Sequence, residues 1–405
     1  MINQTVNQID RLATPDGGSM GGARLAYFCY FAAMAGFMPF LSLYYAQLGL
    51  SASEIGLLVG IPPVVTFVAA PLWGGLADAT HRHKQILSGA VVSAMLVVLV
   101  FLVARGLPLL IPVVVAYALF SAPIMPLIDN TVLAMLGEER ARYGRVRLWG
   151  ALGWGVVGTV GGVLVDWVGL RVSFLNYFVF MLILLLIVLR LPVAQTSIGS
   201  RFWQGARSLF AEPQWVVLLI AIFCSGVAMS ITNSFLFLYV DELGGSRTLM
   251  GLSLTVATVS EVPIFFYAER LLRRWGARGL LAIALLAQVV RTFAYALIPA
   301  AWLILPISLL HGFTFSAMWS ASVAYASELA APKGLMATAQ GLLGGVSMGL
   351  GGVMGALVGG LVYERYGAVA LFVAVGLVAL AGLAFFVAAG PGATEQSRLR
   401  PRYPG

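Results

Sequence analysis

The chain has 405 residues, of which 60% are hydrophobic and only 10% are charged, and its formal net charge is +8. A soluble domain carries about 25% charged residues, so this composition excludes a protein whose surface is mostly in contact with water. In a membrane protein, an excess of positive charge reflects the orientation in the bilayer and contact with lipid headgroups rather than binding to nucleic acid. We therefore expect membrane lipids and no nucleic acid among the partners.

Apolar stretches long enough to cross a hydrocarbon core of about 30 Å, roughly 20 residues each, recur along almost the whole chain. Barrel strands alternate over about ten residues, so the predicted fold class is an all-α polytopic membrane protein. The first stretch follows a polar leader, residues 1–22, and we interpret it as an anchor rather than a signal peptide. The twelve predicted transmembrane helices are 24–47, 55–78, 85–104, 108–136, 146–166, 171–190, 213–240, 249–272, 278–298, 301–329, 335–361 and 368–389.

The basic residues are unevenly distributed between the two sides of this topology. With both termini in the cytoplasm, 19 of the 24 arginines and lysines lie on cytoplasmic segments and 4 on the other side, while Arg291 belongs to neither. This excess predicts a multi-pass protein of the cell membrane with both termini in the cytoplasm. Cys29 and Cys224 both lie inside predicted helices, so we expect no disulfide framework, metal site or cofactor.

The two halves of the chain resemble each other. At an offset of 198 residues Asp166 aligns with Glu364, and a Val-Gly-Gly sequence precedes each of them; at an offset of 191 residues Asp78 aligns with Glu269. Glycines crowd 146–166 and 335–361, which predicts close packing or sliding of these helices. The repeat predicts two pseudo-symmetric six-helix halves with a binding site between them near the midplane. The predicted domains are an N-terminal half at 1–190, a cytoplasmic linker at 191–212, and a C-terminal half at 213–405 with a polar tail at 390–405.

The second predicted helix ends in a distinctive motif. Residues 74–78 read Gly-Gly-Leu-Ala-Asp and are followed by a basic run at 81–84. This pattern resembles the signature loop of the major facilitator superfamily. The arginine expected after the aspartate is Ala79 here, and the expected glycine is His81, so the family's turn and one cation are altered.

The same loop supplies candidate gating residues. Asp78 lies at the cytoplasmic end of its helix, where it can pair with loop arginines such as Arg82 and hold the inner face closed, with Glu269 as its counterpart in the other half. The alternative is a simple topology anchor. We expect His81 and His83 to be solvated in the loop rather than to bind a metal.

Two charges fall inside the fourth and fifth predicted helices. Asp129 and Arg147 are each nine residues from Glu138, so an antiparallel hairpin places them at similar depth. A charge at the bilayer centre costs roughly 2.5–3.5 kcal/mol, so each should face a partner or a wet cavity. Trp154 lies two turns further along on the same face and can offer a flat surface to a ring. We expect these residues, with Asn233 as a weaker candidate, to bind substrate; the alternative is a purely structural pair.

Motifs along nearly the whole chain resemble the lactose permease branch of the superfamily, which comprises oligosaccharide/proton symporters and their phenylpropionate and nucleoside relatives. The resemblance implies that Arg147 holds the substrate, that Trp154 stacks on it, and that Asp129 pairs with the arginine. The motifs are Pro39-Phe40, Pro71-Leu72, Gly144-Arg145-Val146-Arg147, Gly153-Trp154 and Tyr363-Glu364.

The second half contains a comparable group of charges. Arg291 and His311 each lie ten residues from Ala301 in a short turn, so they share a depth, and Glu261 adds a carboxylate. The resemblance implies that this trio couples proton movement to transport, but the permease's main proton-carrying glutamate is Thr314 here, which cannot titrate. Glu261 is then the best proton carrier, because burial favours the neutral carboxyl while Arg291 favours the carboxylate. The alternative is a fixed pair between Glu261 and Arg291.

These features predict secondary active transport of a small organic solute (a sugar, nucleoside or aromatic acid) by alternating access. The predicted mode is proton-coupled symport, with sodium as the alternative coupling ion. The sequence has no Walker-type phosphate loop, which excludes primary pumping. A drug or metabolite antiporter is the nearest alternative, although its Gly-Pro signature is missing from 146–166. A non-transporting receptor or a membrane enzyme is the second alternative, but the sequence shows no nucleophile with an adjacent base to support an enzyme. We expect a monomer that is not an enzyme.

Overall fold

The computed structural model describes residues 17–137, 139, 142–191 and 202–390, and within these residues all regular structure is helical. Most of the predicted leader, linker residues 192–201 and the tail from 391 lie outside the described residues. In the described part, nine helices are long and apolar enough to cross a membrane, or ten if the bent pair Ala301–Ser308 and Gly312–Lys333 forms one span. The prediction of an all-α polytopic membrane protein is therefore confirmed.

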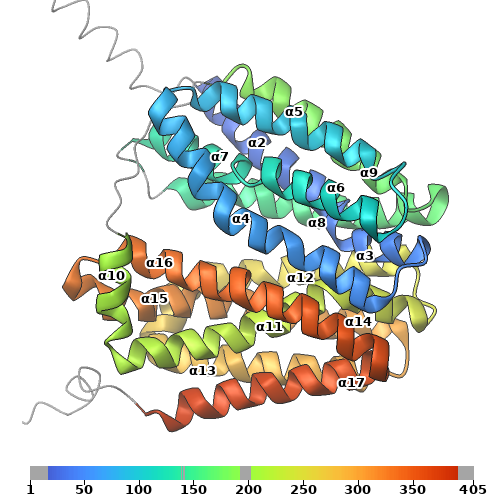
Figure 1. Cartoon of the computed structure of the whole chain (residues 1–405). Coiled ribbons are helices and arrows are strands. Elements are labelled where there is room, and N and C mark those ends of the chain that lie inside the picture. Colours follow the sequence, from blue (N-terminus) through green and yellow to red (C-terminus); the bar gives the residue numbers. More distant parts are fainter. Residues whose placement is uncertain (1–16, 138, 140–141, 192–201, 391–405) are drawn as a thin grey trace, which may run out of the picture.

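The helices are arranged in two groups, which we call the first bundle (α2 to α9) and the second bundle (α10 to α17), and Figure 1 shows one above the other. The first bundle comprises α2 (Gly17–Ala35), α3 (Met38–Gln47), α4 (Ala52–Thr80), α5 (His83–Val100), α6 (Leu107–Ser121), α7 (Ile124–Leu136), α8 (Tyr143–Val168) and α9 (Val172–Val188). The second comprises α10 (Phe202–Phe210), α11 (Pro213–Glu242), α12 (Arg247–Phe266), α13 (Ala268–Ala296), η2 (Ala301–Leu303), α14 (Ile304–Ser308), η3 (Gly312–Ala317), α15 (Met318–Ala330), η4 (Ala331–Lys333), α16 (Met336–Gly344), η5 (Gly345–Gly351) and α17 (Gly352–Ala388).

One predicted boundary is wrong. The helix expected at 249–272 ends at Phe266, and the chain restarts at Ala268 as α13, which leaves helical geometry again at Gly276. The apolar residues after 266 made the span look longer than it is. Three arginines follow within eight residues, and their charge is better solvated on a separate surface turn than at the end of a membrane helix.

Two turn glycines occupy equivalent places in the repeat. Gly169, between α8 and α9, has φ +95°, and Gly367, within α17, has φ +80°. Only glycine adopts this conformation without a steric cost. The chain reverses at Gly367, so that α17 consists of two antiparallel segments in Figure 1.

The kink between α6 and α7 has an identifiable cause. Pro123 has no N–H, so the carbonyl of Leu119, four residues earlier, loses its helical partner. The indole Nε1–H of Trp73 on α4 donates to that carbonyl at 2.9 Å. The bond therefore satisfies the freed acceptor and ties α4 to the kink.

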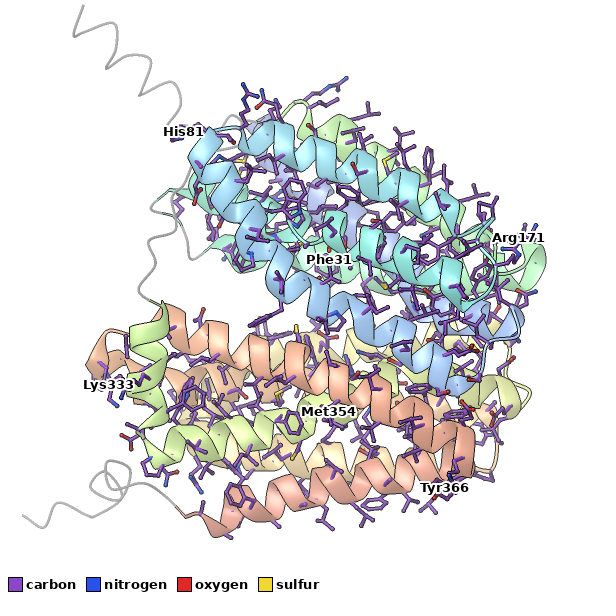
Figure 2. All side chains as sticks on the ribbon, in the orientation of Figure 1. Phe31, His81, Arg171, Lys333, Met354 and Tyr366 are labelled. Atoms are coloured by element: carbon purple, nitrogen blue, oxygen red, sulfur yellow. The ribbon has the colours of Figure 1, made fainter. Side chains whose placement is uncertain are left out.

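The two bundles are in close contact at one end, which we call the joined end. The principal pairs across the interface are α8 with α12 and α4 with α17. A Cβ atom on Gly360 of α17 would lie 2.5 Å from the carbonyl oxygen of Ala52, and one on Gly162 of α8 would collide with the Arg247 carbonyl. The glycines of both predicted glycine-rich helices thus permit backbone contact between bundles. Away from this end the ribbons diverge, toward His81 and Lys333 in Figure 2.

Candidate functional site

The structure brings Asp129 of α7 and Arg147 of α8 together in the first bundle. Their nearest charged atoms, Oδ1 and Nη1, are 3.6 Å apart. The Arg147 side chain is 48% exposed and that of Asp129 is 26% exposed, so the pair faces an accessible space rather than a sealed core. The guanidinium also lies over the Phe31 ring, 5.9 Å from its centroid. A solute that reaches this space can therefore compete for both charges.

Two tyrosines complete this cluster, and sequence reasoning missed both. Tyr143 donates to Asp129 Oδ1 at 2.7 Å and accepts a bond from Arg147 at 3.1 Å. Tyr27 of α2 also donates to Asp129 Oδ1. The position of Tyr143 could have been found, because it precedes Arg147 by four residues and shares its helix face. Tyr27 is 102 residues from Asp129, and no sequence signal links them.

The other two predicted substrate residues are placed less decisively. Trp154 is partly buried against a hydrophobic core cluster that includes residues of both bundles, two turns beyond Arg147 on α8. Asn233 is exposed on α11. Both positions are compatible with a surface that a solute can reach, but the structure shows neither side chain in the Asp129 cluster.

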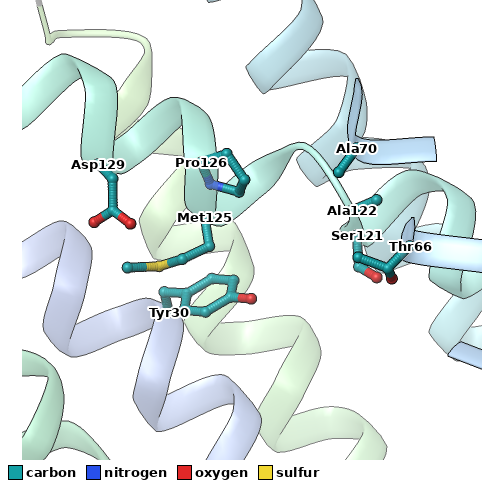
Figure 3. Close-up of a pocket in the computed structure, with 8 residues that line it drawn as sticks. All are labelled: Tyr30, Thr66, Ala70, Ser121, Ala122, Met125, Pro126 and Asp129. Atoms are coloured by element: carbon teal, nitrogen blue, oxygen red, sulfur yellow. The ribbon is translucent and has the colours of Figure 1, made fainter. Parts of the chain in front are cut away.

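A pocket of about 310 Å³ lies beside Asp129, between α2, α4 and the kink of α6 and α7 (Figure 3). Asp129 and Tyr30 stand on one side of it, and Thr66 and Ser121 stand on the other. The complete lining is Tyr30, Thr66, Ala70, Ser121, Ala122, Met125, Pro126 and Asp129.

In the second bundle, Glu261, His311 and Arg291 form a chain with the imidazole in the middle. His311 Nε2 is 3.3 Å from Glu261 Oε1, and its Nδ1 is 2.9 Å from Arg291 Nη1. The same Arg291 nitrogen donates to the Thr314 hydroxyl at 2.9 Å. The fixed pair between Glu261 and Arg291 that we considered is therefore replaced by two contacts through His311.

The contacts of His311 determine which nitrogen carries its proton. Arginine only donates, so the Nδ1 atom facing Arg291 must accept, and the proton of the neutral ring sits on Nε2, facing the Glu261 carboxylate. A second proton on the ring would place an N–H at Nδ1 directly against the N–H of Arg291 Nη1, so that two donors would face each other. Arg291 is only 4% exposed, so water does little to relieve such repulsion. The contacts therefore fit a neutral imidazole with its proton on Nε2.

The backbone next to His311 is adapted to this contact. His311 lies at the 45° bend before the π-helix η3, and the Gly312 N–H donates to the Ser260 hydroxyl at 2.9 Å. A side chain at Gly312 would collide with the Ser260 carbonyl. The glycine therefore lets η3 approach α12 closely, which brings His311 to Glu261.

Each predicted gating carboxylate has a partner in its own bundle. Asp78 pairs with His83 at 3.0 Å, and His83 is only 4% exposed, so our expectation that His83 is solvated in the loop is wrong: it is a buried partner of the signature carboxylate. Arg82 lies at the start of α5, and Glu269 forms an exposed pair with Arg273 of its own helix at 3.6 Å.

His81, the other histidine of the signature loop, has a left-handed backbone conformation that favours glycine. It ends α4 with φ +54° and ψ +29°, and it is the one non-glycine residue of the described chain with positive φ. A side chain therefore adopts this turn conformation at a steric cost.

The aligned carboxylates Asp166 and Glu364 cap helices across the bundle interface. Asp166 of α8 accepts the Arg247 and Thr248 N–H groups at the start of α12, at 3.0 and 2.8 Å. Glu364 of α17 accepts the Ser53 N–H at the start of α4, at 2.8 Å. Each carboxylate thus satisfies first-turn donors of the opposite bundle.

Comparisons with known proteins agree with this architecture. Residues 23–374 match the model of the MFS_1 like family. The chain is 34% identical over 352 residues to a maltose permease of Geobacillus stearothermophilus, covering 86% of this chain and 89% of the relative. It is 29% identical over 310 residues to a probable 3-phenylpropionic acid transporter of Escherichia coli, covering 74% and 80%.

Solved structures share the fold at lower identity. The nucleoside transporter NupG has 18% identity and a TM-score of 0.79, with coverage of 91% of this chain and 98% of that one. A bacterial homologue of the lysosomal transporter Spinster, in an inward-facing and occupied conformation, has 15% identity and a TM-score of 0.73, with coverage of 91% and 96%. Because the family model matches residues 23–374 and the chain is 34% identical to the maltose permease, the chain is a multi-pass membrane protein that belongs to the MFS_1 like family.

Proposed function

We propose that the protein is a secondary active transporter that moves a small organic solute by alternating access between two six-helix halves, 1–190 and 213–405, with twelve membrane crossings. The observation that carries the proposal is the asymmetry of the bundle interface. Helix caps and glycine contacts connect the bundles at one end, while the accessible Asp129–Arg147 pair lies away from it. Rocking of the bundles about a midplane site requires such an arrangement.

The open end of the bundles faces the cytoplasm in this proposal, and both termini lie there. His81 and Lys333 mark this end in Figure 2, and Arg82 follows His81 in the same connection. The positive-inside rule supports this orientation. Cysteines introduced at 82 and 333 should react with an impermeant thiol reagent only from the cytoplasmic side, and one at 169 only from outside. The reverse pattern would refute the orientation.

The solute site is centred on Asp129, Arg147 and Trp154, with Asn233 on the facing bundle. The relatives are named for maltose and 3-phenylpropionic acid, and a transporter of the same fold for nucleosides, so sugars, aromatic acids and nucleosides are the classes to test. Arg147→Lys and Trp154→Ala should each weaken solute binding in folded protein, because lysine keeps the charge but loses the planar fork. Unchanged affinity in both variants would make the Asp129–Arg147 pair structural.

The coupling ion is the proton, carried by Glu261 and steered by His311 and Arg291. What supports this is the chain of contacts in which Arg291 donates to Nδ1 of His311 and Nε2 of His311 faces the Glu261 carboxylate. Protonation of Glu261 removes that acceptor and releases the link between α12 and η3. Uptake into proteoliposomes on a pH gradient tests the coupling, and accumulation on a sodium gradient alone would overturn it in favour of a cation at Asp129 or Glu261.

The residues that hold the cytoplasmic side closed in this proposal are Asp78, Arg82 and Glu269. In the present arrangement Asp78 is held by His83, and Glu269 by Arg273.

A further inference from the structure

We propose that the pocket beside Asp129 is a second subsite of the transport site, and that it takes an uncharged, hydroxyl-bearing ring such as one unit of a disaccharide. This rests on the proposed function, in which Asp129, Arg147 and Trp154 hold the first unit. The pocket does not include Arg147 or Trp154, and Asp129 is the residue that the two subsites share.

The polar groups of the lining have the chemistry to bind hydroxyl groups. Tyr30, Thr66 and Ser121 each contribute a hydroxyl, and they come from three different helices around the pocket. A hydroxyl can donate and accept, and the Ser121 hydroxyl, which donates to the Ala118 carbonyl of its own helix at 3.3 Å, offers the ligand an acceptor. Pro126 has no N–H, so the carbonyl of Ala122, four residues earlier, lacks its usual helical donor and remains available as an acceptor. Neutral sugar hydroxyls match this mixture of donors and acceptors.

The orientation of Asp129 points to the same ligand class. Tyr27, Tyr143 and Arg147 all contact Oδ1. Among the described contacts, therefore, Oδ2 is left to accept a hydrogen bond from a ligand in the pocket. An ionised carboxylate has no donor, so its partner there must bring one.

The charge of the pocket argues against an anionic ligand. Asp129 is the only charged residue in its lining, and the neighbouring cation, Arg147, is engaged with Asp129 and Tyr143. A ligand carboxylate in this pocket would face a carboxylate without a compensating cation, which is unfavourable in a partly desolvated space. An aromatic acid could still bind at Arg147, but it would leave the pocket unused.

The size and rigidity of the pocket fit one ring. Its volume of about 310 Å³ is at the small end of ligand sites, which run from about 300 to 1,000 Å³. The proline kink between α6 and α7 creates the space, and the bond from Trp73 to the Leu119 carbonyl holds α4 against that kink. The walls are thus fixed before a ligand arrives, so ordering them on binding costs little.

The test compares glucose, maltose and 3-phenylpropionate as probes, measured by calorimetry on the purified full chain. Wild-type protein should bind maltose more tightly than glucose. Thr66→Val and Ser121→Ala should each raise the Kd for maltose about two- to tenfold, as expected for one lost hydrogen bond, and should leave the Kd for glucose within about twofold. Ser88→Ala on peripheral α5 removes a hydroxyl bonded to Gln85 of its own helix and serves as the matched control, with no change for either sugar.

A second variant tests the pocket by filling it. Ala70→Phe should abolish the preference for maltose over glucose while glucose still binds, and retained glucose binding also shows that the variant is folded. Equal weakening of both sugars in Thr66→Val, or no weakening of maltose in either hydroxyl variant, would overturn the subsite. So would a wild-type preference for 3-phenylpropionate over both sugars.

These outcomes are separate from failure of the proposed function. If wild-type protein in proteoliposomes moves no solute of any class, the transport proposal fails, and the subsite with it. If it transports sugars and Arg147→Lys impairs them all, while Thr66→Val has no effect on maltose, the transport site stands and the second subsite alone is refuted.

Discussion

The helix caps at the joined end provide a direct test of alternating access. Asp166 accepts bonds from two N–H groups of the opposite bundle, and also from the Thr248 hydroxyl at 2.5 Å. These bonds exist only while the joined end is closed. Asp166→Ala should therefore shift the protein toward the state in which this end is open, and Glu364→Ala, which removes the cap on the Ser53 N–H, should shift it in the same direction.

The magnitude follows from the bonds that are lost. Removing a capping side chain costs about 0.5–2 kcal/mol. Asp166 is exposed, so we take the lower half of that range, about 0.5–1 kcal/mol, which corresponds to a two- to fivefold change in the ratio of closed to open molecules. Glu364 accepts one backbone bond rather than two, so its single variant should have the smaller effect. The two caps involve different helix pairs, so the double variant should combine the effects.

The assay measures the separation of the bundles at this end. Spin labels at 171 and 366 lie on different bundles near the joined end, as Figure 2 shows for Arg171 and Tyr366. Both native cysteines, Cys29 and Cys224, are replaced by alanine before labelling. The distance distribution from pulsed electron spin resonance then gives the populations of the two states, and the longer distance should gain population in the variants.

A matched control is available at the same end. Asp241 forms an ion pair with the Arg247 side chain at 2.6 Å, but both residues belong to the second bundle. Asp241→Ala removes the same charge and leaves the bonds from the α12 backbone to Asp166 intact, so it should leave the distance distribution unchanged. If Asp166→Ala has no effect, or no more effect than Asp241→Ala, the caps do not hold the joined end and the reasoning fails.

Three further predictions address packing, strain and coupling. Gly360→Ala, whose Cβ would lie 2.5 Å from the Ala52 carbonyl oxygen, should also widen the joined end, by overpacking of about 1–3 kcal/mol, whereas Gly89→Ala, with no atom within 4 Å, should not; equal label distances would contradict this. His81→Gly should relieve the left-handed strain and raise stability by about 0.5–1 kcal/mol, seen as a higher melting temperature in detergent; a lower one would count against it. Glu261→Gln should abolish solute accumulation on a pH gradient but leave solute exchange between two pools intact, and continued accumulation would make another carboxylate the proton carrier.

Much of the fold could be predicted from the sequence because its determinants are local. A run of about 20 apolar residues has one low-energy arrangement in a bilayer, a helix across it, so the spans were recognisable without any tertiary contact. The repeat was also informative: the alignment of Asp166 with Glu364 anticipated two carboxylates in equivalent roles, although not that each caps a helix of the other bundle.

The candidate site was accessible to prediction only where chain geometry constrained it. Asp129 and Arg147 belong to neighbouring helices joined by a short connection, so equal spacing from the turn was enough to place them side by side. The burial of His83 could not be predicted, because the same loop sequence fits a solvated turn equally well. Its environment depends on how α5 packs against other helices.

The sequence by itself determined the class of protein, the approximate spans and the presence of costly intramembrane charges that need partners. Only the tertiary structure decided which partners those are: that Tyr27 holds Asp129, that His311 stands between Glu261 and Arg291, and that the bundles are closed at one end. The physical reason is range. Hydrophobic transfer acts residue by residue along the chain, whereas a hydrogen bond reaches about 3 Å and depends on helix packing that brings distant residues together.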